Sequence, residues 1–151
     1  MGSFYLFHWL IVLILIGVPL IFVFKKPPVG PNRFGGRPPA MGFGQAIASF
    51  FKNYVNFSGR ASRSEFWYSA LFIFLVAIVL YVVDRSETLN LIWSLATFLP
   101  SIAMAARRLH DINRNGWWQL LALLVPIGSV VVLAGYCTAS TMDDSREAVF
   151  A

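Results

Sequence analysis

Residues 66–106 read FWYSALFIFLVAIVLYVVDRSETLNLIWSLATFLPSIAMAA, which is two long apolar runs joined by a short polar loop. The runs extend from Phe66 to Val83 and from Leu89 to Ala106, and each approaches the roughly 20 residues that a helix needs to cross a membrane. The loop, Asp84 to Thr88, is so short that the two helices must run antiparallel. This stretch therefore predicts a transmembrane helical hairpin.

Two further apolar runs flank this hairpin. The first, Phe4 to Phe24, is long enough to span; a cleaved signal peptide is the alternative. Residues 1–7 hold no Lys or Arg and no small-residue cleavage site follows, which favours a retained anchor. The last run, Trp117 to Tyr136, is predicted as a fourth span, but Pro126 and Gly128 interrupt it. A re-entrant segment is therefore the alternative for this run.

Composition supports a membrane protein. Of the 151 residues, 58% are hydrophobic and only 13% are charged, whereas soluble domains average about 25% charged residues. We therefore expect an all-α membrane protein with four transmembrane helices and one cytoplasmic interfacial amphipathic helix. The lone Cys137 excludes an internal disulfide framework and a thiolate metal cluster, and no cofactor is predicted. The net charge of +5 sits beside apolar runs, so anionic lipid is the expected partner rather than nucleic acid.

The basic residues predict an orientation. Of the 12 Lys and Arg residues, seven lie in residues 25–65 and three more in residues 107–114. The positive-inside rule then places both basic segments in the cytoplasm and both termini outside. Aromatic belts mark membrane interfaces, so the following residues are expected as anchors at the inner one: Trp67, Trp117 and Trp118.

Four segments are expected along the chain: an N-terminal anchor (1–26), a Pro/Gly-rich cytoplasmic linker (27–42), a membrane domain (43–137) and an acidic tail (138–151). The membrane domain opens with aromatic residues at helical spacing from Phe43 to Phe57. They predict an amphipathic helix in the cytoplasmic interface, with a short helix packed on the rest of the protein as the alternative. Ser62 and Glu65 have the spacing of a capping box for the next helix.

Two motifs on the predicted inner face carry a family resemblance. They are GRASRSEFW at residues 59–67 and RRLHDINRNGWW at residues 107–118, followed by VPIG at residues 125–128. Over Phe43 to Cys137 the chain resembles the bacterial inner-membrane family catalogued as domain of unknown function 805. The resemblance implies a shared fold and a place in a bacterial inner membrane, so that the outer side predicted for both termini would be the periplasm, but it implies no activity. Members of that family often carry a GPNRFG-like stretch after the last span, whereas here GPNRFG stands at residues 30–35, after the first run.

The inner-face motifs supply the candidate site. Guanidinium groups bind phosphates in a bidentate manner, so a cluster of them predicts an anionic lipid or phosphate site. The alternative is that these arginines set the topology, snorkel and form local ion pairs. The candidate ligand-binding residues are Arg60, Arg63, Arg107, Arg108 and Arg114. The residues expected to orient them are Glu65, His110 and Asp111.

The third run carries a polar stripe at helical spacing, formed by Asn90, Ser94, Thr97 and Ser101. Such a stripe serves either helix packing or a pathway for a small polar solute. The hydrocarbon part of the predicted spans holds no acidic or basic residue, which argues against ion-coupled transport.

Catalysis and metal binding receive little support from the sequence. His8 and His110 are predicted about 30 Å apart on opposite faces, so no shared metal is expected. His110 beside Asp111 resembles a general base, but no nucleophile is signposted near it. We therefore expect a non-enzymatic accessory or scaffold subunit that packs against other membrane protein subunits or against itself. The alternative is an oligomeric transport component for a small solute or a lipid.

Overall fold

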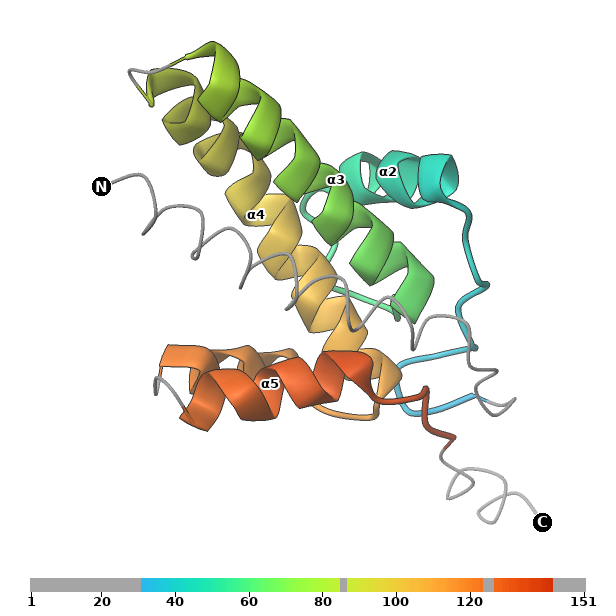
Figure 1. Cartoon of the computed structure of the whole chain (residues 1–151). Helices are drawn as coiled ribbons and strands as arrows, with labels where there is room; N and C mark the ends of the chain where they lie inside the picture. The colour runs from blue at the N-terminus through green and yellow to red at the C-terminus, as the bar shows by residue number, and fades with distance from the viewer. Residues whose placement is uncertain (1–30, 85–86, 124–126, 143–151) are drawn as a thin grey trace, which may run out of the picture.

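The computed structural model of the chain describes residues 31–84, 87–123 and 127–142, so the predicted anchor Phe4–Phe24 lies outside the described residues. Every named element in these ranges is helical, as the sequence predicts. The elements are α2 (Phe43–Lys52), α3 (Arg63–Val83), α4 (Thr88–Asp111), the 3-10 helix η1 (Gly116–Leu123) and α5 (Ile127–Cys137). In Figure 1, α3 and α4 form one long pair, α2 lies against its side, and α5 crosses its lower end.

The predicted hairpin is confirmed as a pair of helices long and apolar enough to cross a membrane. At about 1.5 Å per residue, the 21 residues of α3 and the 24 of α4 each exceed the roughly 30 Å hydrocarbon core. Only 22% and 28% of their most apolar windows are buried within the protein. Core helices of soluble proteins are mostly buried, so this outward apolar surface suits lipid. It includes Leu75, Val79, Val82, Leu91, Ile92, Leu95 and Phe98.

The start of α3 confirms half of the predicted capping box. The Ser62 hydroxyl accepts a hydrogen bond from the backbone N–H of Glu65 at 3.2 Å, which satisfies one of the free donors of the first turn. The Glu65 carboxylate, however, accepts from the Ser49 hydroxyl at 2.9 Å and from Arg107. Glu65 therefore joins three helices, which its place in the capping pattern did not predict.

The amphipathic helix is shorter than predicted. It ends at Lys52 rather than Phe57, because the Asn53 amide bonds back to the Ser49 carbonyl at 2.9 Å and closes the last turn. Its Ala46 and Phe50 are buried against α3, where Ser69 donates a hydrogen bond to the Ala46 carbonyl. The alternative of a helix packed on the protein is thus realised. Phe43 and Phe51 remain 42% and 41% exposed, however, so an apolar face is still available to lipid.

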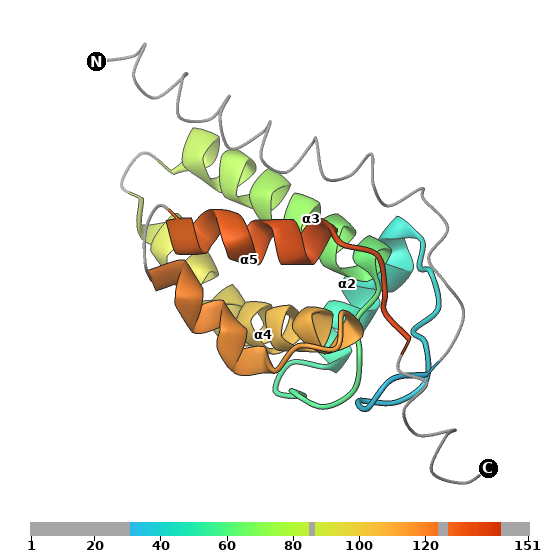
Figure 2. The same cartoon turned by 90° about the horizontal axis from the view of Figure 1, so that it is seen from below.

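The prediction of a fourth span from Trp117 to Tyr136 needs correction. This run forms two short helices, η1 and α5, that pack against each other. Figure 2 shows them side by side, with α5 crossing α3 and α4. From usual helix rises, each is about 16 Å long, roughly half of a hydrocarbon core. Helix η1 ends at Leu123 and α5 begins at Ile127, within the run for which the sequence leaves a re-entrant segment as the alternative.

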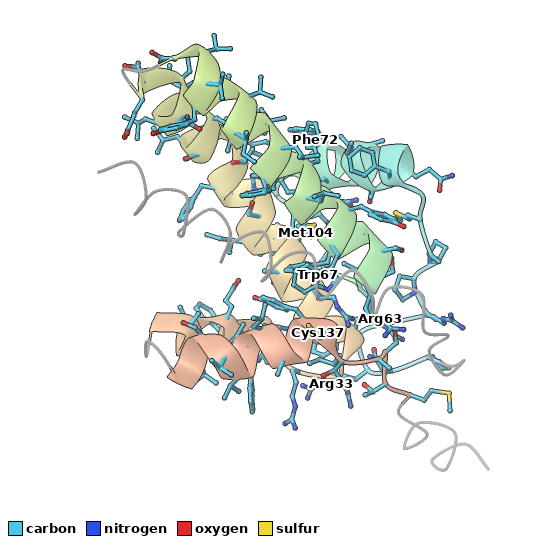
Figure 3. All side chains as sticks on the ribbon, viewed as in Figure 1. Arg33, Arg63, Trp67, Phe72, Met104 and Cys137 are labelled. Carbon is cyan, nitrogen blue, oxygen red and sulfur yellow. The ribbon has the colours of Figure 1, made fainter. Side chains whose placement is uncertain are left out.

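Trp67 is not at an interface, contrary to its predicted role as an anchor. Its side chain is 2% exposed and belongs to a core cluster with Phe50, Phe66 and Met104. Helices α2, α3 and α4 supply this cluster, and Tyr136 of α5 packs against it. Figure 3 shows Trp67 and Met104 inside the helical assembly. By contrast, Trp117 and Trp118 are 73% and 40% exposed, as interfacial anchors require.

Candidate functional site

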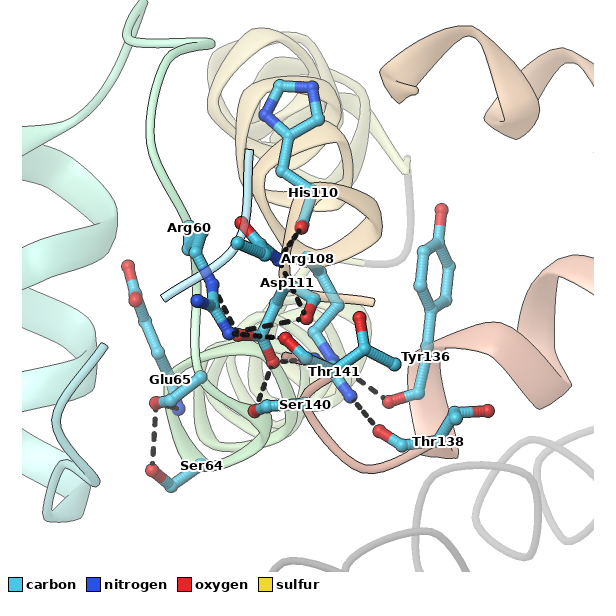
Figure 4. Close-up of polar contacts among 12 residues, drawn as sticks. Arg60, Ser64, Glu65, Arg108, His110, Asp111, Tyr136, Thr138, Ser140 and Thr141 are labelled. Carbon is cyan, nitrogen blue, oxygen red and sulfur yellow. Dashed lines mark hydrogen bonds and ion pairs between the residues drawn. The ribbon is translucent and has the colours of Figure 1, made fainter. Parts of the chain in front are cut away.

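Asp111, at the C-terminal end of α4, is the centre of a buried ion-pair network. Its Oδ1 lies 2.8 Å from Nη2 and 3.0 Å from Nε of Arg60, and its Oδ2 pairs with Arg108. The hydroxyl of Ser140 also donates to Oδ2, at 2.6 Å. The carboxylate is fully buried, and both guanidinium groups are at most 1% exposed. Figure 4 shows these side chains converging from three separate parts of the chain.

Arg108 and Arg60 also bind backbone carbonyls in the last turn of α5 and beyond it. Arg108 donates to the Tyr136 carbonyl at 3.0 Å and to the Thr138 carbonyl, while Nη2 of Arg60 reaches the Thr141 carbonyl at 3.4 Å. The backbone N–H of Thr141 in turn donates to the Asp111 carbonyl at 3.0 Å. The chain that leaves α5 is therefore fixed to the end of α4.

A second buried pair joins α3 to α4. Nη1 of Arg107 lies 2.8 Å from Oε1 of Glu65, and the two side chains are 5% and 1% exposed. The Arg107 carbonyl also accepts from the backbone N–H of Ala61 at 3.0 Å. Each of the two inner-face motifs has one carboxylate, Glu65 or Asp111, and both are bound to arginines inside the protein. Arg60, Arg107 and Arg108 therefore form local ion pairs, which is the alternative that the sequence left open. Their side chains are too buried to form an exposed phosphate site.

Residues 32–35, within the GPNRFG segment, form a turn docked on the same end of α4. The Asn32 amide, 3% exposed, donates to the His110 carbonyl at 2.9 Å and to the Asp111 carbonyl at 3.4 Å. Its side-chain oxygen accepts from the N–H of Phe34, and the Gly35 carbonyl accepts from Arg60 at 3.1 Å. Asn32 thus caps carbonyls that the end of a helix leaves without partners. This part of the linker is bound to the domain.

His110 is held by two contacts at the edge of the network. Its Nδ1 lies 3.0 Å from the Gly59 carbonyl oxygen. The Phe34 ring stacks on the imidazole with centroids 3.9 Å apart and planes 6° apart. The Asp111 carboxylate binds Arg60 and Arg108, whereas the adjacent imidazole of His110 contacts Gly59 and Phe34 instead.

The remaining candidate arginines differ from one another. Arg63, labelled in Figure 3, is 5% exposed and interacts electrostatically with Asp111. Arg114 is exposed, with its guanidinium 4.6 Å from the centre of the Trp118 ring. Of the five predicted arginines, the structure therefore gathers four in the interior and leaves one on the surface.

Comparison with known proteins now places the chain. The family described as "Protein of unknown function (DUF805)" matches residues 54–146, which is more than half of the sequence. This chain belongs to the DUF805 family. Inner membrane protein YhaI of Escherichia coli K12 is 42% identical over 107 residues, covering 68% of this chain and 91% of YhaI. Inner membrane protein YhaH of the same organism is 36% identical over 104 residues, covering 63% of this chain and 86% of YhaH.

No solved structure matches this DUF805 protein. Its relatives are inner-membrane proteins, and its described part holds two helices with the length and composition of membrane spans. The predicted family and the integral membrane class are therefore confirmed. The family match begins at Tyr54, so the buried turn at Asn32 comes from outside the matched residues.

The polar stripe of this DUF805 protein makes hydrogen bonds to the neighbouring helix at one of its positions, Asn90. The Asn90 amide, in the orientation that satisfies both of its polar atoms, donates to the Ala77 carbonyl at 3.2 Å and accepts from the Tyr81 N–H at 3.1 Å. Thr97 is buried and donates to the Trp93 carbonyl of its own helix at 2.8 Å. Ser94 is exposed and Ser101 is half-buried. These contacts support the packing interpretation of the stripe.

Sequence reasoning missed several members of the site. Asn32 was quoted within GPNRFG without a role, and Ser140 and Thr141 were assigned to the acidic tail. The available signal was the Asn-Arg-Phe-Gly order itself. In turns, an Asn side chain often accepts a hydrogen bond from the backbone N–H two residues later, and glycine is common in the same turn. The interaction partners are 78 residues away along the chain and carry no local pattern.

Proposed function

We propose that this protein is a non-enzymatic accessory or scaffold subunit of a membrane complex, and that its cytoplasmic side binds anionic lipid through exposed cations. The carrying observation is the distribution of charge. Away from the α3–α4 loop, both described carboxylates, Glu65 and Asp111, are buried in ion pairs. Every exposed charge on the described residues in that region is positive, and these exposed cations are Arg33, Arg37, Lys52 and Arg114.

Burying the acids makes the exposed cations more effective. An exposed carboxylate among them would cancel part of the attraction to anionic headgroups, each basic residue near the surface contributing about 1 kcal/mol. Exposed aromatic side chains accompany the cations, including Phe43, Phe51, Trp117 and Trp118. Aromatic and cationic groups together are typical of the membrane interface.

The proposed topology follows from the same contacts. Helices α3 and α4 would span the bilayer, with the α3–α4 loop outside, and η1 and α5 would form a re-entrant hairpin. Since residues 138–141 contact Arg60, Arg108 and Asp111, they would share the cytoplasmic side with both basic motifs. This replaces the expectation that the C-terminal tail is periplasmic.

Lipid retention tests the binding proposal. The full-length protein would be extracted into lipid-retaining particles, and bound lipids would be quantified by mass spectrometry. The triple variant Arg33→Gln, Arg37→Gln and Arg114→Gln should lower the ratio of anionic to neutral lipid several-fold. Arg114→Gln alone should lower it more than Arg85→Gln, which removes the same charge in the α3–α4 loop. Equal effects of the two single variants would contradict the proposal.

Co-purifying proteins test the accessory role. Stoichiometric subunits of another membrane protein in the same particles would support it. A homo-oligomer that carries only lipid would overturn the accessory role and leave the lipid-binding part to be decided by the arginine variants.

A further inference from the structure

A pocket of about 460 Å³ lies between the C-terminal part of α4 and the start of η1. Ligand sites usually combine an apolar wall with a few converging polar groups. This pocket has both, and its apolar and polar side chains include Phe57, Ile102, Trp117, His110, Asn115 and Gln119. Among the described residues no Lys, Arg, Asp or Glu lines it, so a ligand would be recognised there by hydrogen bonds and apolar contact.

The imidazole of His110 is fixed so that Nε2 faces this pocket. A carbonyl oxygen only accepts, so the contact with Gly59 places the proton on Nδ1. Nε2 lies 3.5 Å from the position that a Cβ would take at Gly116, another residue of the lining. The neutral ring then presents Nε2 as an acceptor, and no group of the described residues donates to it. The stacked Phe34 holds the ring from one face.

Two amide side chains complete the polar side of the pocket. Asn115 and Gln119 lie four residues apart at the start of η1, and neither makes a side-chain hydrogen bond within the described part of the chain. Each amide offers both donors and acceptors. A ligand group with several hydroxyls could therefore donate to His110 and exchange hydrogen bonds with both amides.

The surroundings indicate a membrane lipid. Ile102 continues the exposed surface of α4, because Phe98 and Leu99, four and three residues earlier, lie on the same face and are 63% and 39% exposed. An acyl chain can follow this surface from the bilayer to the pocket. The exposed guanidinium of Arg114 directly precedes Asn115 in the sequence, but it lies over the Trp118 ring and outside the lining of this pocket.

We propose that the pocket binds the glycerol head group of an anionic glycerophospholipid of the phosphatidylglycerol class. A head-group hydroxyl donates to Nε2 of His110, and the amides of Asn115 and Gln119 bind the other hydroxyl. The inference rests on the proposed function and deepens it, because it names the lipid class that the exposed cations would hold.

A competition between two anionic lipids tests this proposal. The full-length protein would be placed in nanodiscs with equal amounts of phosphatidylglycerol and phosphatidic acid in a neutral lipid, and bound lipids would be counted by native mass spectrometry. Phosphatidic acid has the phosphate without the glycerol head group. We expect a preference for phosphatidylglycerol of about fivefold, which corresponds to one net hydrogen bond of about 1 kcal/mol.

Three variants define the source of the preference. His110→Phe keeps a ring for Phe34 to stack on and removes Nε2, so the preference should disappear. Gln119→Leu should reduce the preference for phosphatidylglycerol and leave the contact between His110 and Gly59 in place. If His110→Phe does not fold, the result for Gln119→Leu tests the pocket assignment. Gln45→Leu removes an amide on α2, outside the pocket, and should leave the preference unchanged.

Three outcomes would overturn the pocket assignment, and they differ in what they leave of the proposed function. Equal retention of the two anionic lipids, both above the neutral lipid, would overturn the pocket assignment and leave the cationic lipid-binding function in place. Retention no better than that of the neutral lipid would overturn both. A preference that survives both His110→Phe and Gln119→Leu would also overturn the pocket assignment.

Discussion

The hydroxyl of Ser140 donates a hydrogen bond to Oδ2 of Asp111 over 2.6 Å, which joins the chain beyond α5 to the end of α4. A four-span topology would place these two residues on opposite sides of a hydrocarbon core of about 30 Å. Their contact requires that the chain between them goes out and returns. The helices η1 and α5, packed side by side, are that return path.

Labelling of single cysteines should confirm this topology. In a Cys137→Ser background, Asn115→Cys and Met142→Cys should react with an impermeant maleimide from the same side of the membrane, because both positions are exposed near the end of α4. Thr88→Cys, at the other end of α4, should react from the opposite side. The background protein without an added cysteine is the control. Labelling of positions 142 and 88 from one side would contradict the re-entrant hairpin.

Replacing Asp111 with Asn should be strongly destabilising. The substitution leaves the buried guanidinium groups of Arg60 and Arg108 without a counter-charge, and breaking a buried pair in this way costs about 3–5 kcal/mol. The free energy of unfolding in detergent–denaturant titrations measures the effect. Asp84→Asn is the matched control, because Asp84 lies partly exposed in the α3–α4 loop. If Asp111→Asn lowers the free energy of unfolding no more than Asp84→Asn does, the network contributes little to stability.

Replacing Asn32 with Ala should loosen the docked turn. The side chain makes three hydrogen bonds at the end of α4 and within its own turn, and leaving buried partners unsatisfied costs about 1–3 kcal/mol. We expect faster proteolysis of residues 31–42 together with a lower unfolding free energy. Asn56→Ala, in an exposed loop, should have little effect on either measurement. Unchanged proteolysis in Asn32→Ala would show that the turn does not depend on this side chain.

Replacing Asn90 with Ala should weaken the contact between α3 and α4 by about 0.6 kcal/mol, the average for such bonds inside membrane proteins. Steric trapping in bicelles can resolve a change of this size. Ser94→Ala lies on the same helix but is exposed, so it should leave the stability unchanged. If Ser94→Ala lowers the stability more than Asn90→Ala does, the helix-packing interpretation of the stripe would be wrong. A role of the stripe outside the α3–α4 pair would then be favoured.

Local patterns predicted most of the secondary structure. The apolar runs of α3 and α4 and the short loop between them specify an antiparallel hairpin, because a few residues cannot carry the chain back across a bilayer. Ser62 at the start of α3 signals a helix cap for the same local reason. The shorter α2 was misjudged because Asn53 closes the helix through its own side chain, which apolar periodicity does not register.

The composition of the arginine-rich motifs marks them as a candidate site, but it does not indicate whether the arginines bind a ligand or pair with carboxylates inside the protein. A guanidinium that binds a phosphate and one that is buried against a carboxylate have the same sequence signature. The difference lies in the partner, and Asp111 receives Arg60 from 51 residues away and Ser140 from 29 residues away. Such long-range pairing depends on how helices pack, which no local pattern encodes.

Composition and apolar periodicity determined that this chain is helical, enters a membrane and carries its cations in two segments. These properties follow from the transfer of side chains into hydrocarbon, to which each residue contributes separately. The packing of η1 against α5, the burial of Trp67 and the internal use of Glu65 and Asp111 depend on contacts between distant residues. They were settled by the folded arrangement, because the cost of a buried charge or an open helix end depends on what lies against it.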